Sequence, residues 1–580
     1  MSHFVQDPAS PVRSYAALLL ARAVQQAFAG GKLGLFALTN QGFYYDFDLP
    51  SPLGEEDLKI IEQHMDALAA EKAPFGYRDI SKEEALLIFE AREERWKVEW
   101  LKSLPASEPV LLFEQSGFVD VLDIRYSAVL AEWSASQKPV FKLLNVSGAY
   151  WEGDSSKPVL QRIYGVAFEH GKELRRFLSL QEEAQKRDHR KLGKQLELFM
   201  FADEAPGMPF YLPKGTQMRN ELENLSRRYL KKYGYEEVRT PFIMNRQMWE
   251  QSGHWEHYRE NMYFSEIDHH QYAVKPMNCP GHMLLYKNKR RSYRDLPVRY
   301  AEYGQVHRYE YSGALNGLFR VRTFCQDDAH LFVTPEQVEQ EIKRTLQMIQ
   351  EIYGIFGFEY SLELSTRPAD SMGSDEQWEL AEQALATVLD ELELDYSLNP
   401  GDGAFYGPKI DFHIKDALDR SHQCGTIQLD FQMPEKFGLS YYDERNERQT
   451  PIVIHRAVYG SIDRFLGILI EHYGGVFPAW LAPVQVAVLP VAETHAAYGE
   501  EICQKLRSAG IRVELDERNE KLGYRIREAQ LQKVPYMLIV GDAEREAGLI
   551  QVRAFGEQRQ ESMDLDVFMA SLQQRMAEQK

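Results

Sequence analysis

Apolar and polar positions alternate with different periods along the chain, and the first stretch, residues 1–170, mixes helical and strand-like patterns. Apolar residues recur at helical spacing over 14–28, whereas GFYYDFDL at 42–49 has the composition of a strand. An acidic segment at about 82–98 has the pattern of another helix. This stretch therefore predicts an N-terminal α+β domain.

A second stretch, residues 171–200, is dense in charge and predicts a partly exposed linker helix. Its leucines stand at helical spacings, at positions Leu174, Leu178, Leu192 and Leu196. The third and largest stretch, 201–482, opens with GTQMRNELENLSRRYLKKYGYEEVRTPFIM at 215–244. This segment predicts an amphipathic helix followed by a strand that ends at Pro241. The apolar face of the helix carries Met218, Leu222, Leu225 and Tyr229.

In the fourth stretch, residues 483–580, apolar runs alternate with predicted helices at 496–508 and 520–533. The runs are VQVAVLP, IRVELD and YMLIVG. Such alternation is typical of a βαβ domain with a largely parallel sheet. The chain as a whole is therefore predicted to be an α+β multidomain protein.

Composition agrees with a multidomain protein of a reducing compartment. A chain of 580 residues can form about three or four domains with separate cores. Four cysteines without regular spacing argue against a disulfide framework. The net charge of −20 argues against a nucleic-acid partner, although local basic surfaces can still hold RNA. The apolar run AALLLA at 16–21 is too short for a membrane span, so we expect a cytoplasmic protein.

Three residues far apart in the chain are candidate metal ligands. They are Cys279 in KPMNCPGH, His330 in RTFCQDDAHLF and His455 in IHRAVYGSIDRF. Catalytic zinc sites use three protein ligands and leave the fourth tetrahedral position open. Since the chain has 16 histidines, most of which are expected to be packed or solvated, the surrounding motifs must decide between these readings.

Those motifs resemble the class II aminoacyl-tRNA synthetases. AEYGQVHRYEYSGALNGLFRVRTFCQDDAH at 301–330 resembles motif 2, in which two antiparallel strands and a loop hold ATP. The segment around His455 resembles motif 3, and residues 215–244 resemble motif 1, which implies a homodimer. Over nearly all of 140–580 the chain is similar to the threonyl-tRNA synthetases.

The resemblance implies a class II antiparallel sheet flanked by helices, a C-terminal α/β anticodon-binding domain and an N-terminal α+β editing-like domain. It implies domain limits at 1–170, 171–200, 201–482 and 483–580. The implied partners are L-threonine, ATP with Mg²⁺, and tRNA(Thr), and the implied metal is one zinc ion per subunit.

ATP must be bound without a phosphate loop, because no GxxxxGK[ST] occurs and GDGAFYG at 401–407 fails GxGxxG. Arginine suits this task, since a guanidinium binds phosphate through two hydrogen bonds and stacks on adenine. By resemblance, Arg308 contacts the α-phosphate, Arg320 the γ-phosphate and Arg464 the adenine. The full set implied for ATP is Arg308, Glu310, Arg320, Phe324, Gln423, Thr426 and Arg464.

The implied catalytic residues are Arg308, Lys409 and His254, the last near the terminal adenosine of tRNA. The residues implied for threonine are Met277, Gln326, Asp328, Tyr406 and Gln428. A metal explains the choice of substrate, because an apolar pocket separates valine from threonine by only about 10²-fold. Threonine offers an amino group and a hydroxyl to the metal, whereas valine lacks the hydroxyl.

Anticodon contacts are implied at Asn519, Lys521, Arg527, Glu544 and Arg553. A solvated charged face on an α/β domain accounts for most of the other charges there.

The N-terminal domain departs from the family pattern. The numbering opens directly at what resembles the editing module, without the ubiquitin-like domain with which bacterial members usually begin. The positions of the two histidines of HxxxH, the cysteine and the last histidine of that module are occupied by Ser14, Leu18, Leu122 and Tyr126. We therefore predict a folded domain that does not edit serine. The alternative is a shifted alignment in which Asp120 or Asp123 does this work.

The function implied by the resemblance is ATP-dependent charging of tRNA(Thr) with L-threonine. One alternative is a synthetase-like regulator that does not charge tRNA, which would be expected to lose a zinc ligand, a motif arginine or the anticodon domain. None is lost. The other is a duplicate or antibiotic-tolerant threonyl-tRNA synthetase paralogue, which would need the same active site.

Overall fold

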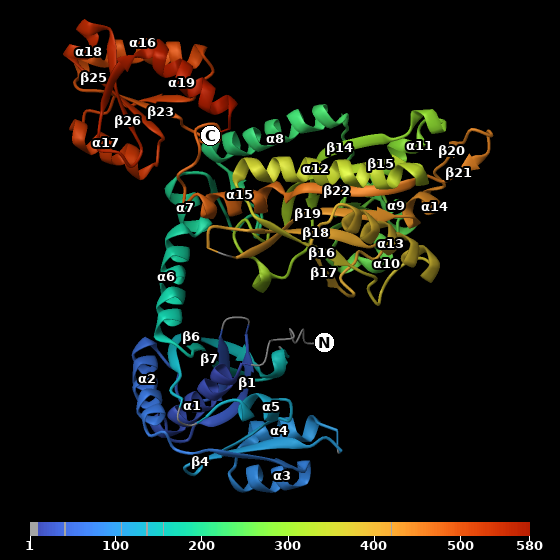
Figure 1. Cartoon of the computed structure of the whole chain (residues 1–580), viewed down its shortest axis with the longest axis vertical. Helices are drawn as coiled ribbons and strands as arrows, with labels where there is room; N and C mark the ends of the chain where they lie inside the picture. The colour runs from blue at the N-terminus through green and yellow to red at the C-terminus, as the bar shows by residue number, and fades with distance from the viewer. Residues whose placement is uncertain are drawn as a thin grey trace. The chain divides into compact units, whose positions relative to one another are not determined.

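The computed structural model describes residues 10–39, 42–105, 107–134, 137–154, 156–418 and 420–579. The chain forms two compact units, one ending at Glu182 and the other beginning at Glu183 (Figure 1). No helix within the described ranges is long and apolar enough to cross a membrane.

The N-terminal unit packs a buried helix against an antiparallel sheet, which confirms the predicted α+β mixture. α1 (Pro11–Ala27) lies against the sheet of order β1-β2-β7-β6. The strands of this sheet are β1 (Lys32–Leu38), β2 (Phe43–Asp48), β6 (Val140–Tyr150) and β7 (Val159–Phe168). A second sheet holds β3 (Gly76–Ile80), β4 (Val110–Gln115) and β5 (Phe118–Asp123). The other helices are α2 (Glu55–Ala70), α3 (Lys82–Ala91), α4 (Arg95–Ser103) and α5 (Tyr126–Ala131).

The single helix predicted at 82–98 is wrong, because two helices meet there at a sharp turn. Glu93 adopts a left-handed conformation with φ 55°, which ends the helical path. The carboxylate of Glu94 then turns inward and accepts a hydrogen bond from the backbone N–H of Leu33 at 2.8 Å. This tertiary contact overrides the local helical pattern.

The linker is likewise two helices, α6 (Gly171–Arg187) and α7 (His189–Gln195). Asp188 separates them and caps α7 by accepting a hydrogen bond from the backbone N–H of Arg190 at 2.8 Å. No side chain of α6 is buried, as expected for an exposed connecting helix.

The second unit is built on an eight-stranded sheet of order β10-β14-β15-β22-β19-β18-β16-β17, in which the five central pairings are antiparallel. The strands are β10 (Glu236–Glu237), β14 (Val298–His307), β15 (Thr323–Val333), β16 (Tyr360–Ser365), β17 (Tyr396–Asn399), β18 (Lys409–Lys415), β19 (Ser421–Asp430) and β22 (Ile452–Ser461). β14 and β15 are the two antiparallel strands predicted for 301–330. The strand predicted to end at Pro241 is only the two residues of β10.

Helices cover one face of this sheet through its largest apolar core (Figure 1). The opposite face, called the polar face below, carries the paired residues His330, His455 and Gln428. The covering helices are α8 (Pro213–Tyr233), α12 (Val338–Phe356), α13 (Asp375–Glu391) and α15 (Ile462–His472). On β15, Ala329 and Leu331 point into that core, so His330 between them points to the opposite face. Shorter elements border the polar face, namely α9 (Arg246–Gln251), α10 (His254–His257), α11 (Cys279–Lys287), α14 (Gln432–Phe437) and the sheet of β11 (Ile243–Asn245), β12 (Phe264–Ile267) and β13 (His270–Val274).

The C-terminal domain is mixed rather than largely parallel. Its sheet has the order β24-β23-β25-β26-β27, with β23 parallel to β24 and β25, and the last two pairings antiparallel. A parallel crossover needs about a dozen residues, and only α18 (Asp542–Ala547) and its flanks join β25 to β26. The remaining elements are β23 (Val486–Pro490), α16 (Ala496–Ser508), β24 (Val513–Leu515), α17 (Leu522–Leu531), β25 (Tyr536–Val540), β26 (Leu549–Ala554), β27 (Glu561–Asp564) and α19 (Leu565–Ala577).

Candidate functional site

One row of paired residues crosses the polar face of the large sheet and carries much of the candidate site. His330 on β15 pairs with His455 on β22, His455 pairs with Gln428 on β19, and Gln428 pairs with Lys409 on β18. The next row holds Asp328, Ala457 and Thr426. Strand register therefore pairs residues as far apart in the chain as Asp328 and Ala457, which are 129 positions apart.

The three predicted metal ligands converge beside this row. Cys279 begins α11, and its sulfur and the nearest ring nitrogens of His330 and His455 lie within 4.8 Å of one another. All three residues are buried. The structure thus gathers Cys279, His330 and His455 as the sequence predicted.

The donor atoms of this cluster suit a metal ion. Nε2 of His330 and Nδ1 of His455 are buried, and neither has a hydrogen-bond partner in the described part of the chain. Nε2 of His455 lies 2.9 Å from Oδ2 of Asp430, which fixes the ring and leaves Nδ1 free as a ligand atom. Burial lowers the pKa of His330 well below its usual value, so the imidazole is neutral, as metal coordination requires. Burial raises the pKa of the Cys279 thiol, and a bound cation reverses that preference.

The residues implied for threonine surround the cluster. Asp328 accepts a hydrogen bond from Nδ2 of Asn278 at 3.0 Å, and burial raises the pKa of its carboxyl. The ring of Tyr406 stacks on His455 at 4.9 Å between centroids, and its hydroxyl donates to Gln428. Gln326 lies two residues before Asp328 on β15, and Met277 packs against the neighbouring core.

Most of the residues implied for ATP lie on β14, on β15 or in the loop between them, and Arg464 lies in α15, directly after β22. The guanidinium of Arg308 lies 5.1 Å from the ring centre of Phe324, and its Nε donates to the carbonyl of Pro276. Glu310 and Arg320 form an ion pair at 2.9 Å. Nε of Arg464 is buried and has no partner within the described residues. Glu310 and Arg320 neutralise each other in this structure. Their ion pair would have to break before either side chain could contact a nucleotide.

A β-bulge brings Gln423 and Thr426 toward a common face. These residues are three apart, so a regular strand would point them in opposite directions. The register of β18 and β19 shifts between Asp411 and His413, which inserts an extra residue between Gln423 and Thr426. The family resemblance assigned both residues to ATP, but nothing in the sequence predicted the bulge that brings them to one face.

Lys409 and His254 complete the predicted catalytic set. Burial opposes the charge of Lys409, but Asp411 at 2.6 Å and Asp402 at 3.0 Å raise its pKa above the usual value. His254 is fully buried, with Nδ1 at 2.9 Å from Oγ of Ser252. Burial, together with the nearby charge of Arg308, lowers the pKa of His254 to about 3. His254 is therefore a neutral hydrogen-bonding group at physiological pH.

The five residues implied for the anticodon fall into two groups. All three of the first group are exposed: Asn519 precedes α17, Lys521 is its N-cap residue and Arg527 lies within it. Glu544 caps α18 by accepting from the backbone N–H of Gly541 at 2.9 Å, and Nε of Arg553 donates to the carbonyl of Glu557. The first group presents free polar surface, whereas the second also serves the local fold.

At the predicted editing positions the N-terminal unit presents apolar packing. Leu18 and Leu122 belong to one buried core, and the ring of Tyr126 lies 4.7 Å from that of Phe36. Ser14 is fully buried. Asp120 is also buried, with Nζ of Lys97 at 2.6 Å and the hydroxyl of Tyr45 at 2.6 Å. Asp123 pairs with Arg125 at 2.8 Å.

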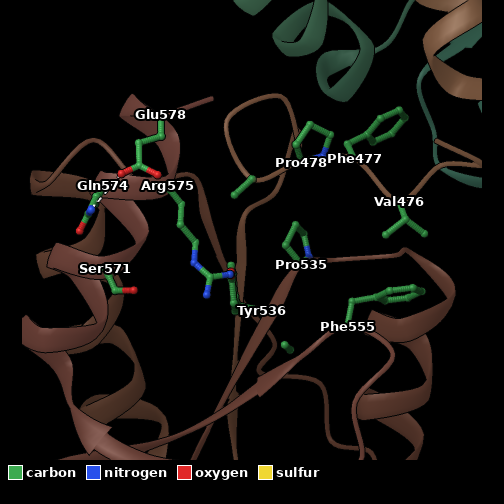
Figure 2. Close-up of a pocket in the computed structure, with 12 residues that line it drawn as sticks. Val476, Phe477, Pro478, Pro535, Tyr536, Phe555, Ser571, Gln574, Arg575 and Glu578 are labelled. Atoms are coloured by element: carbon green, nitrogen blue, oxygen red, sulfur yellow. Dashed lines mark hydrogen bonds between the residues drawn. The ribbon is translucent and has the colours of Figure 1, made fainter. Parts of the chain in front are cut away.

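Two other features of the second unit do not belong to the candidate site. Asp188, His189 and Glu471 also cluster, but both ring nitrogens of His189 are engaged, Nδ1 with Glu471 at 2.6 Å and Nε2 with the backbone N–H of Leu318 at 2.9 Å. A cavity of about 580 Å³ lies between residues 476–479 and the C-terminal domain, where Nη1 of Arg575 donates to Tyr536 (Figure 2). It is lined by none of the candidate residues.

Three residues that support the cluster were missed by sequence reasoning. They are His282, Glu302 and Asp430, all buried beside the predicted ligands. The spacing of Cys279 and His282 on one helix was the available signal for the first. For Glu302 and Asp430 only the strand register reveals the role.

Two family models match the chain. The tRNA synthetase class II core domain (G, H, P, S and T) matches residues 263–473, and the anticodon binding domain matches residues 485–575. Threonine-tRNA ligase 2 of Bacillus subtilis is 57% identical over 98% of this chain and 88% of that protein. Threonine-tRNA ligase of Carboxydothermus hydrogenoformans is 54% identical over 94% of this chain and 85% of that protein.

Two solved structures are similar to about two thirds of this chain. The RNA binding domain of threonyl-tRNA synthetase from Cryptosporidium parvum has a TM-score of 0.66 and 43% identity, covering 67% of this chain and 98% of that one. The putative threonyl-tRNA synthetase ThrRS-1 from Aeropyrum pernix has a TM-score of 0.60 and 30% identity, covering 68% and 96%.

Proposed function

This chain belongs to the threonyl-tRNA synthetases, which are class II aminoacyl-tRNA synthetases, and we propose that it joins L-threonine to tRNA(Thr) at the expense of ATP. The threonine carboxylate attacks the α-phosphorus of ATP, and pyrophosphate leaves. The threonyl group then passes from the adenylate to the terminal ribose of tRNA(Thr). The observation that carries this function is the convergence of Cys279, His330 and His455 beside the row of polar residues on the class II sheet.

The protein contributes charge and position to adenylate formation. Arg308 and Arg464 lie in matched motifs and offer guanidinium groups to the nucleotide, with Mg²⁺ accompanying ATP. Gln423 and Thr426 are proposed to hold the ribose, and Phe324 to pack against the adenine. Because Glu310 pairs with Arg320 at 2.9 Å, we propose that ATP separates this pair and binds both partners.

Selection of threonine rests on the Cys279, His330 and His455 cluster. Cys279, His330 and His455 would hold a zinc ion, which would supply Lewis-acid chemistry toward the amino group and the hydroxyl of threonine. Asp328 is proposed to accept a hydrogen bond from the substrate hydroxyl, with Gln326, Tyr406 and Gln428 as its proposed neighbours. Met277 borders the same space. His254, neutral and buried, is proposed to hydrogen-bond the terminal adenosine.

Further proposals concern the rest of the molecule. Asn519, Lys521, Arg527, Glu544 and Arg553 are proposed to meet the anticodon. Motif 1 is proposed to form a homodimer interface, which sedimentation of the purified chain would test.

The proposed domains are 1–170, 171–200, 201–482 and 483–580. All four cysteines are free and buried, which agrees with a cytoplasmic location.

A duplicate synthetase is the second candidate. The Bacillus subtilis relative is named threonine-tRNA ligase 2, and the residues of this chain predicted to stand at the editing positions are Ser14, Leu18, Leu122 and Tyr126. Both candidates charge tRNA(Thr), so they differ in the cell rather than at the active site.

The test is aminoacylation of tRNA(Thr) with threonine, serine and valine in parallel. We expect charging with threonine and slower charging with serine, while valine is rejected because it lacks the hydroxyl. The proposed function would be contradicted if valine were charged as fast as threonine. It would also be contradicted if none of the three amino acids were charged.

A further inference from the structure

We propose that Glu302 and His282 are positioning residues that orient the metal ligand His330 through two hydrogen bonds in series. Neither residue would touch the metal or the substrate. The inference rests on the proposed function for the identity of the metal, and it adds a role for two residues outside the ligand set.

The chain of contacts is buried from end to end. Nδ1 of His282 lies 2.8 Å from Nδ1 of His330, and Nε2 of His282 lies 3.2 Å from Oε2 of Glu302. Both imidazoles are 0% exposed and Glu302 is 4% exposed, so water does not compete for these bonds. His282 comes from α11, three residues after Cys279, whereas Glu302 comes from β14.

Glu302 is itself held in one place and one charge state. It accepts hydrogen bonds from the backbone N–H of Thr240 at 2.7 Å and from Nζ of Lys275 at 3.1 Å. Burial opposes its ionisation, but the hydrogen bond from His282 and the charge of Lys275 lower its pKa to about 2. Glu302 is therefore a carboxylate that can only accept hydrogen bonds.

The position of each proton follows from that carboxylate and from metal coordination. Nε2 of His282 donates its proton to Glu302, and Nδ1 of His282 faces Nδ1 of His330 as the acceptor. Coordination of the metal through Nε2 of His330 places the His330 proton on Nδ1, from which it is donated to His282. Nε2 of His330 has no hydrogen-bond partner in the described chain, and a ring nitrogen of His330 lies within 4.8 Å of the donor atoms of Cys279 and His455.

His455 is oriented by one direct contact with a carboxylate, and its free nitrogen is Nδ1 rather than Nε2. Its Nε2 lies 2.9 Å from Asp430, so Nδ1 remains free for the metal. The two ligand histidines would therefore coordinate through opposite nitrogens, each selected by a carboxylate on its far side. Partners of this kind typically contribute about 10–100-fold to metal affinity.

The experiment measures the zinc dissociation constant of the purified full-length chain by chelator competition. His282→Leu removes the acceptor for His330, and Glu302→Gln replaces a pure acceptor by an amide that can also donate. His282→Asn places an oxygen near the position of Nδ1 and so retains the acceptor. Tyr286→Phe is the matched control, since it lies one turn along α11 and its hydroxyl has no partner among described residues.

We expect His282→Leu and Glu302→Gln to bind zinc about 10–100-fold more weakly than the parent. His282→Asn should lie closer to the parent than His282→Leu, and Tyr286→Phe should match the parent. The absorption spectrum of the cobalt-substituted chain should change in His282→Leu and not in Tyr286→Phe, because it reports the arrangement of ligands around the metal.

The proposal is overturned if His282→Leu, with an unchanged far-ultraviolet circular dichroism spectrum, binds zinc as tightly as the parent. It is also overturned if His282→Asn and His282→Leu lose zinc equally, because the acceptor at the Nδ1 position would then be irrelevant. A parent chain without zinc affinity overturns it as well. Charging of tRNA(Thr) by that same preparation then tells whether the proposed function stands.

Discussion

At the scale of single residues, the site is marked by buried polar atoms that the protein does not satisfy. Nε2 of His330, Nδ1 of His455, Oγ1 of Thr426 and Nε of Arg464 have no hydrogen-bond partner among the described residues. Buried polar groups are usually paired, and these four unpaired atoms belong to residues proposed for zinc and for ATP.

Replacing Cys279 should remove the metal. Cys279→Ser exchanges a soft thiolate for a hydroxyl, which zinc binds poorly, so zinc content should fall from about one ion per chain to near zero. Threonine-dependent pyrophosphate exchange should be lost while the circular dichroism spectrum is retained. Cys503→Ser is the control, because Cys503 is buried in the C-terminal domain and should leave zinc in place. An active preparation without zinc contradicts the prediction.

The two arginines of motifs 2 and 3 should fail in different ways. Arg308→Ala should lower the rate of pyrophosphate exchange by about 10²–10³-fold, because charge compensation in the transition state is lost. Arg464→Ala should mainly raise the KM for ATP. Arg294→Ala, on the surface beside Tyr293, is the control and should behave as the parent. Near-normal exchange by Arg308→Ala would show that this residue has another role.

At the scale of elements, the loop between β14 and β15 is held by a linker helix. Nε2 of His189 on α7 accepts the backbone N–H of Leu318, and the His189 ring lies 4.2 Å from that of Phe319. Glu471 on α15 orients the other side of His189. The linker therefore helps to shape the loop that carries Arg320.

A methyl group at Gly317 should disturb this loop. Gly317 has φ +49°, and a Cβ there would lie 2.1 Å from Nε2 of His189. Gly317→Ala must displace either the loop or His189, so we expect the KM for ATP in pyrophosphate exchange to rise several-fold. Gly313→Ala in the same loop meets no atom within 4 Å and should match the parent. Equal KM values for the two variants would contradict the argument.

At the scale of the whole molecule, the N-terminal unit retains a complete core although the editing groups are absent from the predicted positions. Leu18 and Leu122 pack in that core, and neither side chain can activate water. Serine shares the amino group and hydroxyl of threonine, and one missing methyl gives only about 10–200-fold discrimination. We therefore expect the N-terminal unit to be a folded domain that contributes to the structure of the protein or has a role other than editing.

We expect this protein to leave Ser-tRNA(Thr) uncleaved. Preformed Ser-tRNA(Thr), incubated with the purified chain, should lose serine at nearly the spontaneous rate, and serine should accumulate on tRNA(Thr) during charging. Rapid deacylation contradicts this prediction. If Asp120→Asn abolished such deacylation, the buried Lys97 and Asp120 pair would be its source.

The elements of the fold could be predicted from the sequence where they depend on residues close together in the chain. The helix at 496–508 was predicted at its observed bounds because its apolar period is regular. The break at Glu93 was missed because the contact that stabilises it, from Glu94 to Leu33, joins residues 61 positions apart. The antiparallel end of the C-terminal sheet was missed because apolar runs do not reveal strand direction.

The sequence by itself determined the family, the class II architecture and the three candidate metal ligands that the fold brings together, because these depend on residue types in long, specific motifs. Only the tertiary structure decided which atoms those residues present. Strand register set His330 beside His455, a bulge turned Gln423 toward the face of Thr426, and buried carboxylates selected one nitrogen of each imidazole. These choices depend on partners distant in the chain, and folding alone brings such partners within hydrogen-bond distance.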